Sequence, residues 1–567
     1  MLDLIVRGGT LIDGTGAPRA TADVGIRGGK IAAIGRISEP ARRTIDADGL
    51  WVTPGWVDVH THYDGQVTWD SLLTPSCWHG VTTVVMGNCG VGFAPVRPGS
   101  HDFLIKLMEG VEDIPGTALA EGIKWEWESF PEYLDAVERI PHALDVGAQV
   151  PHAALRFYVM GERGADHQER PTPEEIDTMG RLVRDAVRAG ALGFTTSRTR
   201  NHRASDGRHT PSLTATAAEL VGISRRFGEA GSGVFEIVSD FPDPEAEWEL
   251  LREMVSASGR PMSISIAQSD VSPDAWRASL RKLEEANAAG LPMRGQVAAR
   301  AIGTLLGLEA TLHPFISHPS YAAIAALPLP EKVARLRDPE LRRRLLAEES
   351  APGLRMFADP ERIFALGDPP DYEPPREKSV AAEARRRGVS PGELLLDLLT
   401  ADDGHALLYR PLLNYSGFDL GAIREMLVHP LTVPGLGDAG AHCGLICDGS
   451  FPTYLLLHWG RDRTRGEKLP VEELVKRQTS DTAALVGLDD RGALVPGRKA
   501  DLNLIDPDAL ALAHPEIVHD LPAGGKRLVQ RARGYRATLV SGEVVLENGE
   551  PTGALPGKLV RGPQRAA

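Results

Sequence analysis

The sequence predicts an α/β protein built on a (β/α)8 barrel, with a small β-sandwich made from both chain ends and an inserted helical subdomain. Three observations lead to this fold class. Strand-like apolar runs alternate with amphipathic stretches through the middle of the chain, both ends show short alternating segments, and one long stretch interrupts the alternation. Alternating strands and helices are typical of a parallel sheet covered by helices.

The middle of the chain, residues 55–486, contains the runs that we interpret as barrel strands: VDVHTH, VTTVVMGN, LDVGAQV, ALGFTTS, GVFEIVS, PMSISIA, PMRGQVA and VPGLGD. Between them lie amphipathic helices such as Pro173 to Ala189 and Pro244 to Ser258. This alternation predicts a closed parallel barrel. Active-site residues of such barrels lie at the carboxyl ends of the strands.

The two ends of the chain have a different pattern. Residues 1–54 and 487–567 contain short alternating segments separated by glycine-rich turns, as in LIVRGGTLID and GYRATLVSGEVVLENGE. This pattern is typical of antiparallel sheet, so both ends are expected to build one small sandwich. Residues from about 313 to 401 contain helices and a proline-rich segment, DPPDYEPPREKS, and predict an inserted helical subdomain.

The composition is that of an ordinary globular protein, with 42% hydrophobic and 25% charged residues. No apolar run reaches the roughly 18 to 20 residues that span a membrane. The formal net charge of −15 argues against a nucleic-acid partner, because phosphate binding needs clustered basic residues. Four cysteines are too few for a disulfide framework and favour a cytoplasmic protein. The composition is compatible with a homo-oligomer.

Two histidines stand at the end of the first barrel run, WVDVHTHY. Alternate side chains of a strand share a face, so His60 and His62 point the same way and can bind one metal ion. A lone pair of this spacing is more often a surface or hydrogen-bonded pair. The end of a barrel strand, however, is where a catalytic ion is expected.

Cys89 ends the second run and Asp438 ends the last, and both strands adjoin the first in a closed barrel. Imidazole, thiolate and carboxylate groups are zinc ligands, so His60, His62, Cys89 and Asp438 predict one zinc ion per chain. Asp438 is the expected general base: it takes a proton from a metal-activated water that attacks the carbonyl carbon of a small-molecule amide, and passes it to the leaving nitrogen as the C–N bond breaks. Taken alone, the cysteine suits an inert buried thiol and the aspartate a turn.

At these residues the chain resembles the amidohydrolase superfamily and, more narrowly, the N-acyl-D-amino-acid deacylases (D-aminoacylases). The matching stretches are TPGWVDVHTHYDGQ, GVTTVVMGNCGVGFAP, the late Asp438 and a tail containing LVPGRKADLNLIDPD. The resemblance implies a (β/α)8 barrel with a composite β-sandwich. It also implies zinc held by His60, His62, Cys89 and Asp438, and amide hydrolysis with Asp438 as the base.

The chain departs from that family's pattern at two places. The family normally has one histidine on strand five and another on strand six, whereas GVFEIVSDF and MSISIAQSD contain none. Glu236 and Gln268 occupy the neighbourhood and are poor substitutes for two imidazoles, although a glutamate oxygen can bind zinc. The family's lysine for the substrate carboxylate is also missing. We therefore expect a single ion and a substrate that differs from a simple N-acyl-D-amino acid.

Four further residues are candidates for substrate binding. Arg198 and His202 lie in the basic segment FTTSRTRNHRASDGRH after the fourth strand. An arginine fork suits a substrate carboxylate, and His202 suits polarisation of a substrate carbonyl. His152 ends the third strand, where it equally suits a bond to a backbone carbonyl, and Tyr63 follows the histidine pair. A charge-dense loop is more often simply solvated.

Two other functions stay open. A cyclic-amide hydrolase of the hydantoinase or dihydropyrimidinase type would use a lysine on strand four, and ALGFTTSRT contains none. Loss of the strand-five and strand-six histidines would also suit a metal-poor barrel that serves as a binding protein. Bound metal distinguishes this binding protein from a hydrolase.

Overall fold

The computed structural model describes residues 1–566 and contains an eight-stranded parallel sheet. Its strands adjoin one another in chain order. They are β6 (Trp56–Asp58), β7 (Val81–Met86), β8 (Asp145–Pro151), β9 (Gly193–Arg198), β10 (Val234–Ser239), β11 (Met262–Ser265), β12 (Met293–Val297) and β16 (Thr432–Pro434). Every residue of β7 and β8 is buried, as expected when helices cover a parallel sheet. The predicted α/β class and strand runs are confirmed.

The first and last strands of this sheet meet just beyond their carboxyl ends. Thr61 forms a parallel bridge with Ala439, and the amide of His62 donates to the carbonyl of Ala439 at 2.8 Å. The amide of Thr61 donates to the carbonyl of Val85 in β7 at 3.1 Å. The sheet therefore curls back on itself, and the segment after β6 is held on both sides.

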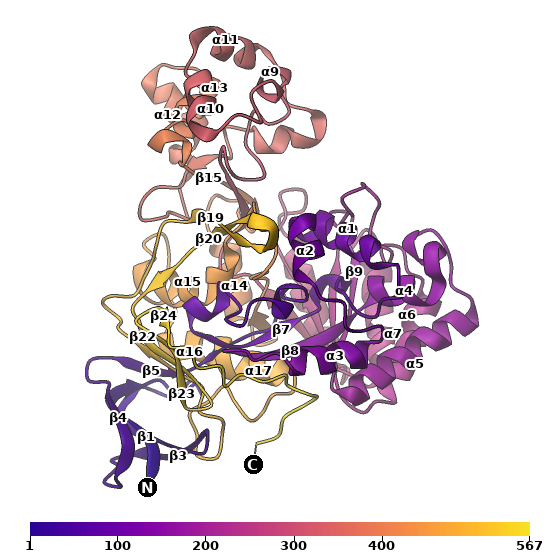
Figure 1. Ribbon diagram of the computed structural model, residues 1–567, viewed down its shortest axis with the longest axis vertical. Helices are drawn as coiled ribbons and strands as arrows, with labels where there is room; N and C mark the ends of the chain where they lie inside the picture. The colour runs from indigo at the N-terminus through magenta and orange to yellow at the C-terminus, as the bar shows by residue number, and fades with distance from the viewer. Residues whose placement is uncertain (567) are drawn as a thin grey trace.

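Helices follow the strands along the outside of the sheet (Figure 1). α5 (Pro173–Ala189) and α7 (Pro244–Ser258) have the limits expected from the sequence. Thr172 and Glu175 form a capping box at the start of α5, and such a cap contributes about 1 kcal/mol. Further helices are α1 (His101–Glu112), α2 (Gly116–Gly122), α3 (Phe130–Glu138), α4 (His152–Met160), α6 (Ala217–Gly228), α8 (Ala275–Ala288) and α14 (Gly421–Val428).

A nine-stranded sheet joins the two ends of the chain, in the order β24-β23-β22-β17-β5-β1-β2-β3 with β4 paired to β1. Its strands are β1 (Leu2–Leu11), β2 (Ala20–Arg27), β3 (Lys30–Gly35), β4 (Ala41–Asp46), β5 (Trp51–Pro54), β17 (Leu502–Ile505), β22 (Tyr535–Val540), β23 (Glu543–Glu547) and β24 (Glu550–Pro551). Antiparallel pairing of β5 with β17 places Val52 opposite Leu504, and both side chains belong to one hydrophobic cluster. The composite β unit is therefore present, while the divisions at residues 54 and 486 stay predictions.

The chain between β12 and β16 forms a helical lobe. At its base β13 (Ile302–Leu306) pairs antiparallel with β15 (Leu408–Leu413). Its helices are α9 (Pro319–Ala322), α10 (Leu329–Leu336), α11 (Pro339–Ala347), α12 (Val380–Arg387) and α13 (Pro391–Leu399). Leu336, Leu345 and Leu396 lie in a hydrophobic cluster of the lobe's own. Figure 1 shows the lobe projecting from the main body, so the inserted helical unit has both its own core and its own outline.

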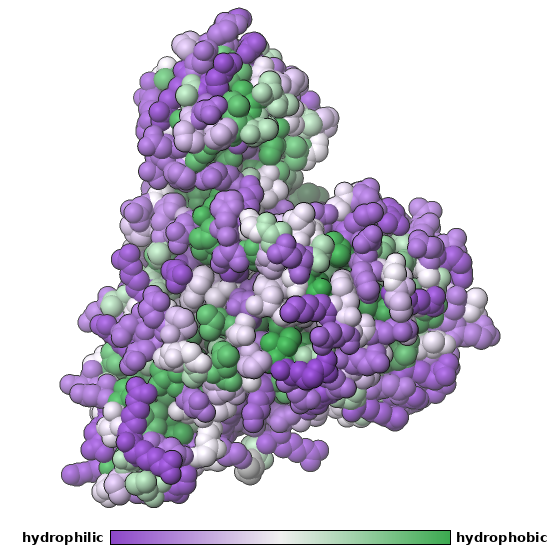
Figure 2. Space-filling view, in the orientation of Figure 1, coloured by the Kyte–Doolittle hydropathy of each residue, from purple (hydrophilic) through white to green (hydrophobic). Residues whose placement is uncertain are grey.

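The face drawn in Figure 2 is mainly hydrophilic, with smaller hydrophobic patches on the lobe and the end sheet. Within residues 1–566, no helix is long and apolar enough to cross a membrane. The four cysteines are all buried and unpaired, in agreement with the expectation that disulfides do not support this fold.

Candidate functional site

His60 and His62 lie side by side beyond the end of β6. The backbone bonds of Thr61 to β7 and of His62 to the segment after β16 hold this stretch in place. Both histidine side chains are 1% exposed, and their ring centroids are 5.5 Å apart. The two imidazoles therefore face one buried site, as alternate residues of an extended chain do.

Cys89 reaches the same site through a tight turn after β7. Gly87 has a φ of 86°, and a Cβ there would lie 2.2 Å from the carbonyl oxygen of Gln149, so the turn requires glycine. Cys89 itself has a φ of 55°, uncommon for a residue with a side chain. Its amide donates to Glu236 Oε2 at 2.8 Å, and its Sγ lies 3.4 Å from His60 Nε2. The turn therefore directs the thiol at the imidazole.

Asp438 reaches the site from the loop after β16. Its Oδ1 lies 3.1 Å from His60 Nε2 and 3.4 Å from His62 Nε2. The Asp438 side chain is 18% exposed, against 1% for each histidine, and a small cavity of about 20 Å³ borders it. The structure thus brings together all four residues expected to bind metal, with Asp438 on the accessible side.

Two buried carboxylates also approach this cluster. Glu112, at the end of α1, places Oε1 3.4 Å from His62 Nδ1 and Oε2 3.5 Å from His442 Nε2. Glu236 on β10 is the residue expected in place of the strand-five histidine, and it contacts the amide of Cys89. Glu112 was not predicted, because a glutamate at the end of an ordinary amphipathic helix carries no signal in the sequence. The carboxylate of Glu112 lies beside His62 only because the chain after β7 leads α1 back to the site.

Gln296 on β12 was also missed, and it orients His60. Its Oε1 lies 2.8 Å from His60 Nδ1, while its amide nitrogen donates to Ser263 Oγ at 2.9 Å. A bond at Nδ1 leaves Nε2 to face Cys89 and Asp438. Gln268 does not join this set, because its side chain bonds the carbonyl of Pro273 and the amide of Ser416.

The donor atoms of the site fit a metal ion. One ligand atom from each of His60, His62 and Cys89 lies within 4.8 Å of the others. Both ring nitrogens of His62 and one oxygen each of Glu112 and Glu236 are buried without a hydrogen-bond partner. Such orphaned polar atoms are costly unless a ligand satisfies them. Nitrogen and sulfur donors beside carboxylates are ligand types that transition-metal ions bind in proteins.

The electrostatics of the site point the same way. Burial, and then the charges of Glu236 and Glu112, raise the pKa of the Cys89 thiol well above its ordinary value. Burial and the charge of Asp438 raise the pKa of Glu112 in the same direction. The surrounding carboxylates thus oppose ionisation of the Cys89 thiol, and a bound cation would favour it.

His202 lies within the electrostatic reach of this cluster. Its Nδ1 is 2.9 Å from Ser197 Oγ. Burial, and then the charges of His442 and His62, lower the pKa of His202 to about 3. A neutral imidazole can donate a hydrogen bond. Polarisation of a substrate carbonyl by His202 stays a prediction.

The other three substrate-binding candidates have protein partners. The guanidinium of Arg198 forms a fork to Glu247, with Nε 2.6 Å from Oε1 and Nη2 3.0 Å from Oε2. His152 bonds Thr196 Oγ1 at 2.9 Å and Glu219 Oε1 at 3.2 Å. The Tyr63 hydroxyl donates to Ser76 Oγ at 2.8 Å and is buried. These contacts support structural roles, and substrate contact by these residues stays a prediction.

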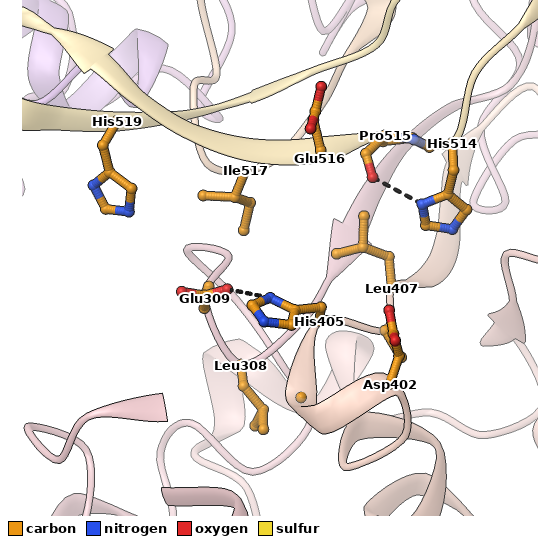
Figure 3. Close-up of a pocket in the computed structure, with 13 residues that line it drawn as sticks. Leu308, Glu309, Asp402, His405, Leu407, His514, Pro515, Glu516, Ile517 and His519 are labelled. Carbon is orange, nitrogen blue, oxygen red and sulfur yellow. Dashed lines mark hydrogen bonds and ion pairs between the residues drawn. The ribbon is translucent and has the colours of Figure 1, made fainter. Parts of the chain in front are cut away.

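A separate pocket of about 590 Å³ lies between the base of the lobe and β19 (Glu516–Leu521) (Figure 3). Glu309 Oε2 and His405 Nδ1 are 2.9 Å apart on one wall, and His514 and His519 stand on the other. The imidazoles are spread around an open space and do not converge. This pocket shares no residue with the His60 cluster.

Known deacylases are similar to this chain over nearly its whole length. D-aminoacylase of Alcaligenes xylosoxydans xylosoxydans is 28% identical, over 98% of this chain and 97% of the relative. N-acyl-D-glutamate deacylase of the same organism is 28% identical, over 99% and 96%. A solved N-acyl-D-glutamate deacylase from Bordetella bronchiseptica, complexed with zinc and a phosphonate inhibitor, has a TM-score of 0.65 and 25% identity over 99% of both chains.

The model of one family, described as the amidohydrolase family, matches residues 43–546. This match covers the barrel strands, the helical lobe and the part of the end sheet that contains β5, β17 and β22. With the deacylase relatives, it identifies an enzyme that hydrolyses carbon–nitrogen bonds other than peptide bonds. The chain belongs to the amidohydrolase family.

Proposed function

We propose that this protein is a zinc-dependent hydrolase that removes the acyl group from N-acyl-D-amino acids or closely related small amides. The observation that carries the proposal is the convergence of His60, His62 and Cys89 within 4.8 Å, with Asp438 Oδ1 against both imidazoles. The names of the full-length relatives support the amide class. One ion per chain is proposed because strand six supplies no ligand and Gln268 is engaged elsewhere.

Zinc, when bound by His60, His62, Cys89 and Asp438, would lower the pKa of a coordinated water and polarise the scissile carbonyl. The protein supplies the ligands and their orientation. Gln296 holds His60 through Nδ1, and Glu112 lies against Nδ1 of His62. Both contacts leave Nε2 facing the centre, which is how outer carboxylates and amides set the orientation of a metal-binding histidine.

Asp438 is proposed as the general base. Burial opposes its ionisation, but the charge of His60 at 3.1 Å, with the His62 imidazole at 3.4 Å, outweighs burial and holds the Asp438 pKa well below its usual range. The carboxylate is therefore ionised at neutral pH. Because Oδ1 contacts both imidazoles, Oδ2 is left to accept the proton of the attacking water and to return it to the leaving nitrogen.

Elemental analysis tests the metal centre directly. Purified protein is expected to contain about one zinc per chain, and His60→Ala and Cys89→Ala should each lose most of it because each removes one donor of a small ligand set. Cys77→Ala is the matched control, since Cys77 is also buried and unpaired. Folded wild-type protein without metal would exclude the hydrolase and favour the binding protein. Two ions per chain would exclude the single-ion assignment.

Replacing Glu112 by glutamine tests the outer carboxylate. We expect zinc affinity to fall about 10-fold to 100-fold, because the partner of His62 Nδ1 loses its charge. The measurement is competition for zinc against a chelator of known affinity. Glu109→Gln, in the same helix, changes a carboxylate that bonds the amide of Gly116 and should leave the affinity unchanged. Equal affinity in both variants would remove Glu112 from the site.

A substrate panel separates the amide classes. N-acetyl-D-amino acids are expected to be hydrolysed faster than hydantoins and dihydropyrimidines, and the reverse order would reinstate the cyclic-amide hydrolase.

A cytoplasmic location is also proposed, because all four cysteines are unpaired.

A further inference from the structure

A second pocket lies beside the loop that carries His202. It has a volume of about 380 Å³ and is bordered by the loop after β9 together with the segments that follow α4 and β10. Five of its lining residues bear basic side chains: Arg198, Arg200, Arg203, His167 and His209. The described acidic groups on its wall are Asp240 and Glu247.

Both acidic groups are already engaged. Glu247 accepts the fork of Arg198 and a hydrogen bond from Ser239 Oγ at 2.8 Å. Asp240 accepts hydrogen bonds from Thr199 Oγ1 and, at 2.8 Å, from the backbone amide of Arg200. The ion pair of Arg198 and Glu247 is neutral as a whole, so Glu247 does not offset the positive charges of Arg200 and Arg203.

The guanidinium groups of Arg200 and Arg203 keep donors available. Among the described residues, neither has a carboxylate within 4.0 Å, and Arg203 reaches only the carbonyl of Gly207 at 3.4 Å. The two arginines carry two positive charges against the single charge of Asp240. An unpaired guanidinium presents a planar set of donors that matches a carboxylate or phosphate.

The histidines add an unsatisfied polar atom. His209 Nδ1 is buried without a hydrogen-bond partner, and the ring stands edge-on to His167 with centroids 5.4 Å apart. Burial, and then the charges of Arg203, His167 and Arg200, lower the pKa of His209. The pocket therefore has a positive field, which an anion would relieve.

The loop is preorganised. Arg203 and His209 face each other in an antiparallel bridge, and the amide of Ala204 donates to the carbonyl of Arg208 at 2.8 Å. The amide of Ser205 donates to the carbonyl of Lys106 in α1 at 2.9 Å, which fastens the loop to the body. His202 lies between Arg200 and Arg203 in the chain and bonds Ser197. The loop that carries His202 thus also carries Arg200, Arg203 and His209 of the pocket.

We propose that Arg200, Arg203 and His209 form a binding site for a small oxyanion, preferably a carboxylate. Two sources share this chemistry: the acidic side chain of an extended amide substrate, or a free small anion that acts on the enzyme through the His202 loop. The site itself does not depend on the proposed hydrolysis. Only its link to the substrate rests on that proposal.

Calorimetric titration with succinate tests the site without any turnover. Succinate should bind the metal-loaded wild-type enzyme at low ionic strength and more weakly as salt increases. Arg200→Ala and Arg203→Ala should each weaken binding about tenfold, because each removes a charged donor. The matched control is Arg225→Ala, an exposed arginine of α6 outside this pocket. Absence of binding to wild type, or equal binding by all variants, would overturn the proposal.

Kinetics then identify the source of the anion. If it is the acidic side chain of the substrate, Arg200→Ala should raise KM for N-acetyl-D-glutamate about tenfold and leave KM for N-acetyl-D-alanine unchanged. If it is a free anion, succinate should change the rates of both substrates alike and the variant should abolish that response. An enzyme inactive on both amides would contradict the proposed function, while the titration would still decide whether the pocket binds anions.

Discussion

Replacing Asp438 by asparagine is expected to lower kcat/KM by about a thousandfold, because the variant keeps the shape of the side chain but loses the group that accepts the proton. The amide oxygen still fits between His60 Nε2 and His62 Nε2, the contacts made at 3.1 and 3.4 Å by Oδ1 of the aspartate. The fold should therefore persist. Steady-state kinetics with saturating zinc, beside a thermal melt, are the measurements.

The control for this substitution is Asp419→Asn, which changes a carboxylate that bonds the amide of Gly421 at the start of α14. That variant should retain wild-type kcat/KM. If Asp438→Asn instead retained turnover with zinc bound, Asp438 would no longer be the base. The pH dependence of kcat/KM tests the same assignment, because a base with a depressed pKa is already ionised at neutral pH.

Replacing Asp145 by alanine is expected to lower the free energy of unfolding by about 3 kcal/mol, because buried Arg491 loses its buried charge partner and keeps only the more exposed Asp490. Asp145 begins β8, and its Oδ2 lies 2.6 Å from Arg491 Nη1 and 3.1 Å from Lys499 Nζ. Its Oδ1 accepts the backbone amide of Lys558 at 2.9 Å. The carboxylate thus joins the barrel to the C-terminal part of the chain. Urea denaturation measures the loss.

The matched control is Asp135→Ala, which removes an exposed partner of Arg561 and should cost at most about 1 kcal/mol. A similar cost for both variants would contradict the proposed importance of the buried group.

The contribution of Asp145 should depend on pH. Burial acts to raise the pKa of Asp145, but Lys499 and Arg491 outweigh burial and lower it. A carboxyl group with a lowered folded-state pKa stabilises the protein above its unfolded value of about 3.9, and this stabilisation is lost as pH falls through the folded value. The difference between wild type and Asp145→Ala should therefore be largest near neutral pH and shrink in acid. A constant difference across that range would exclude ionisation of Asp145 as its origin.

Some residues of the site can be predicted from the sequence, because local backbone geometry is enough to place them. His60 and His62 follow a strand, and the two-residue period of an extended chain places them on one face. Cys89 and Asp438 follow β7 and β16, which flank β6 in a curled parallel sheet. Chain order then brings their ends together. The amphipathic period also anticipated α5 and α7, and the structure adds a polar N-cap followed by proline at the start of each.

Other features depend on contacts between segments distant in sequence. Glu112 reaches His62 only because α1 ends above the barrel, and Gln296 reaches His60 across 236 positions of sequence. The tertiary structure also decided that Arg198 pairs with Glu247, while Arg200 and Arg203 face a pocket. The sequence by itself therefore determined the barrel strands and the four candidate ligands, because hydrophobic periodicity and the order of the strands along the chain can be read directly from it. Charge pairing, burial and the orientation of the ligands arise only when distant segments pack together.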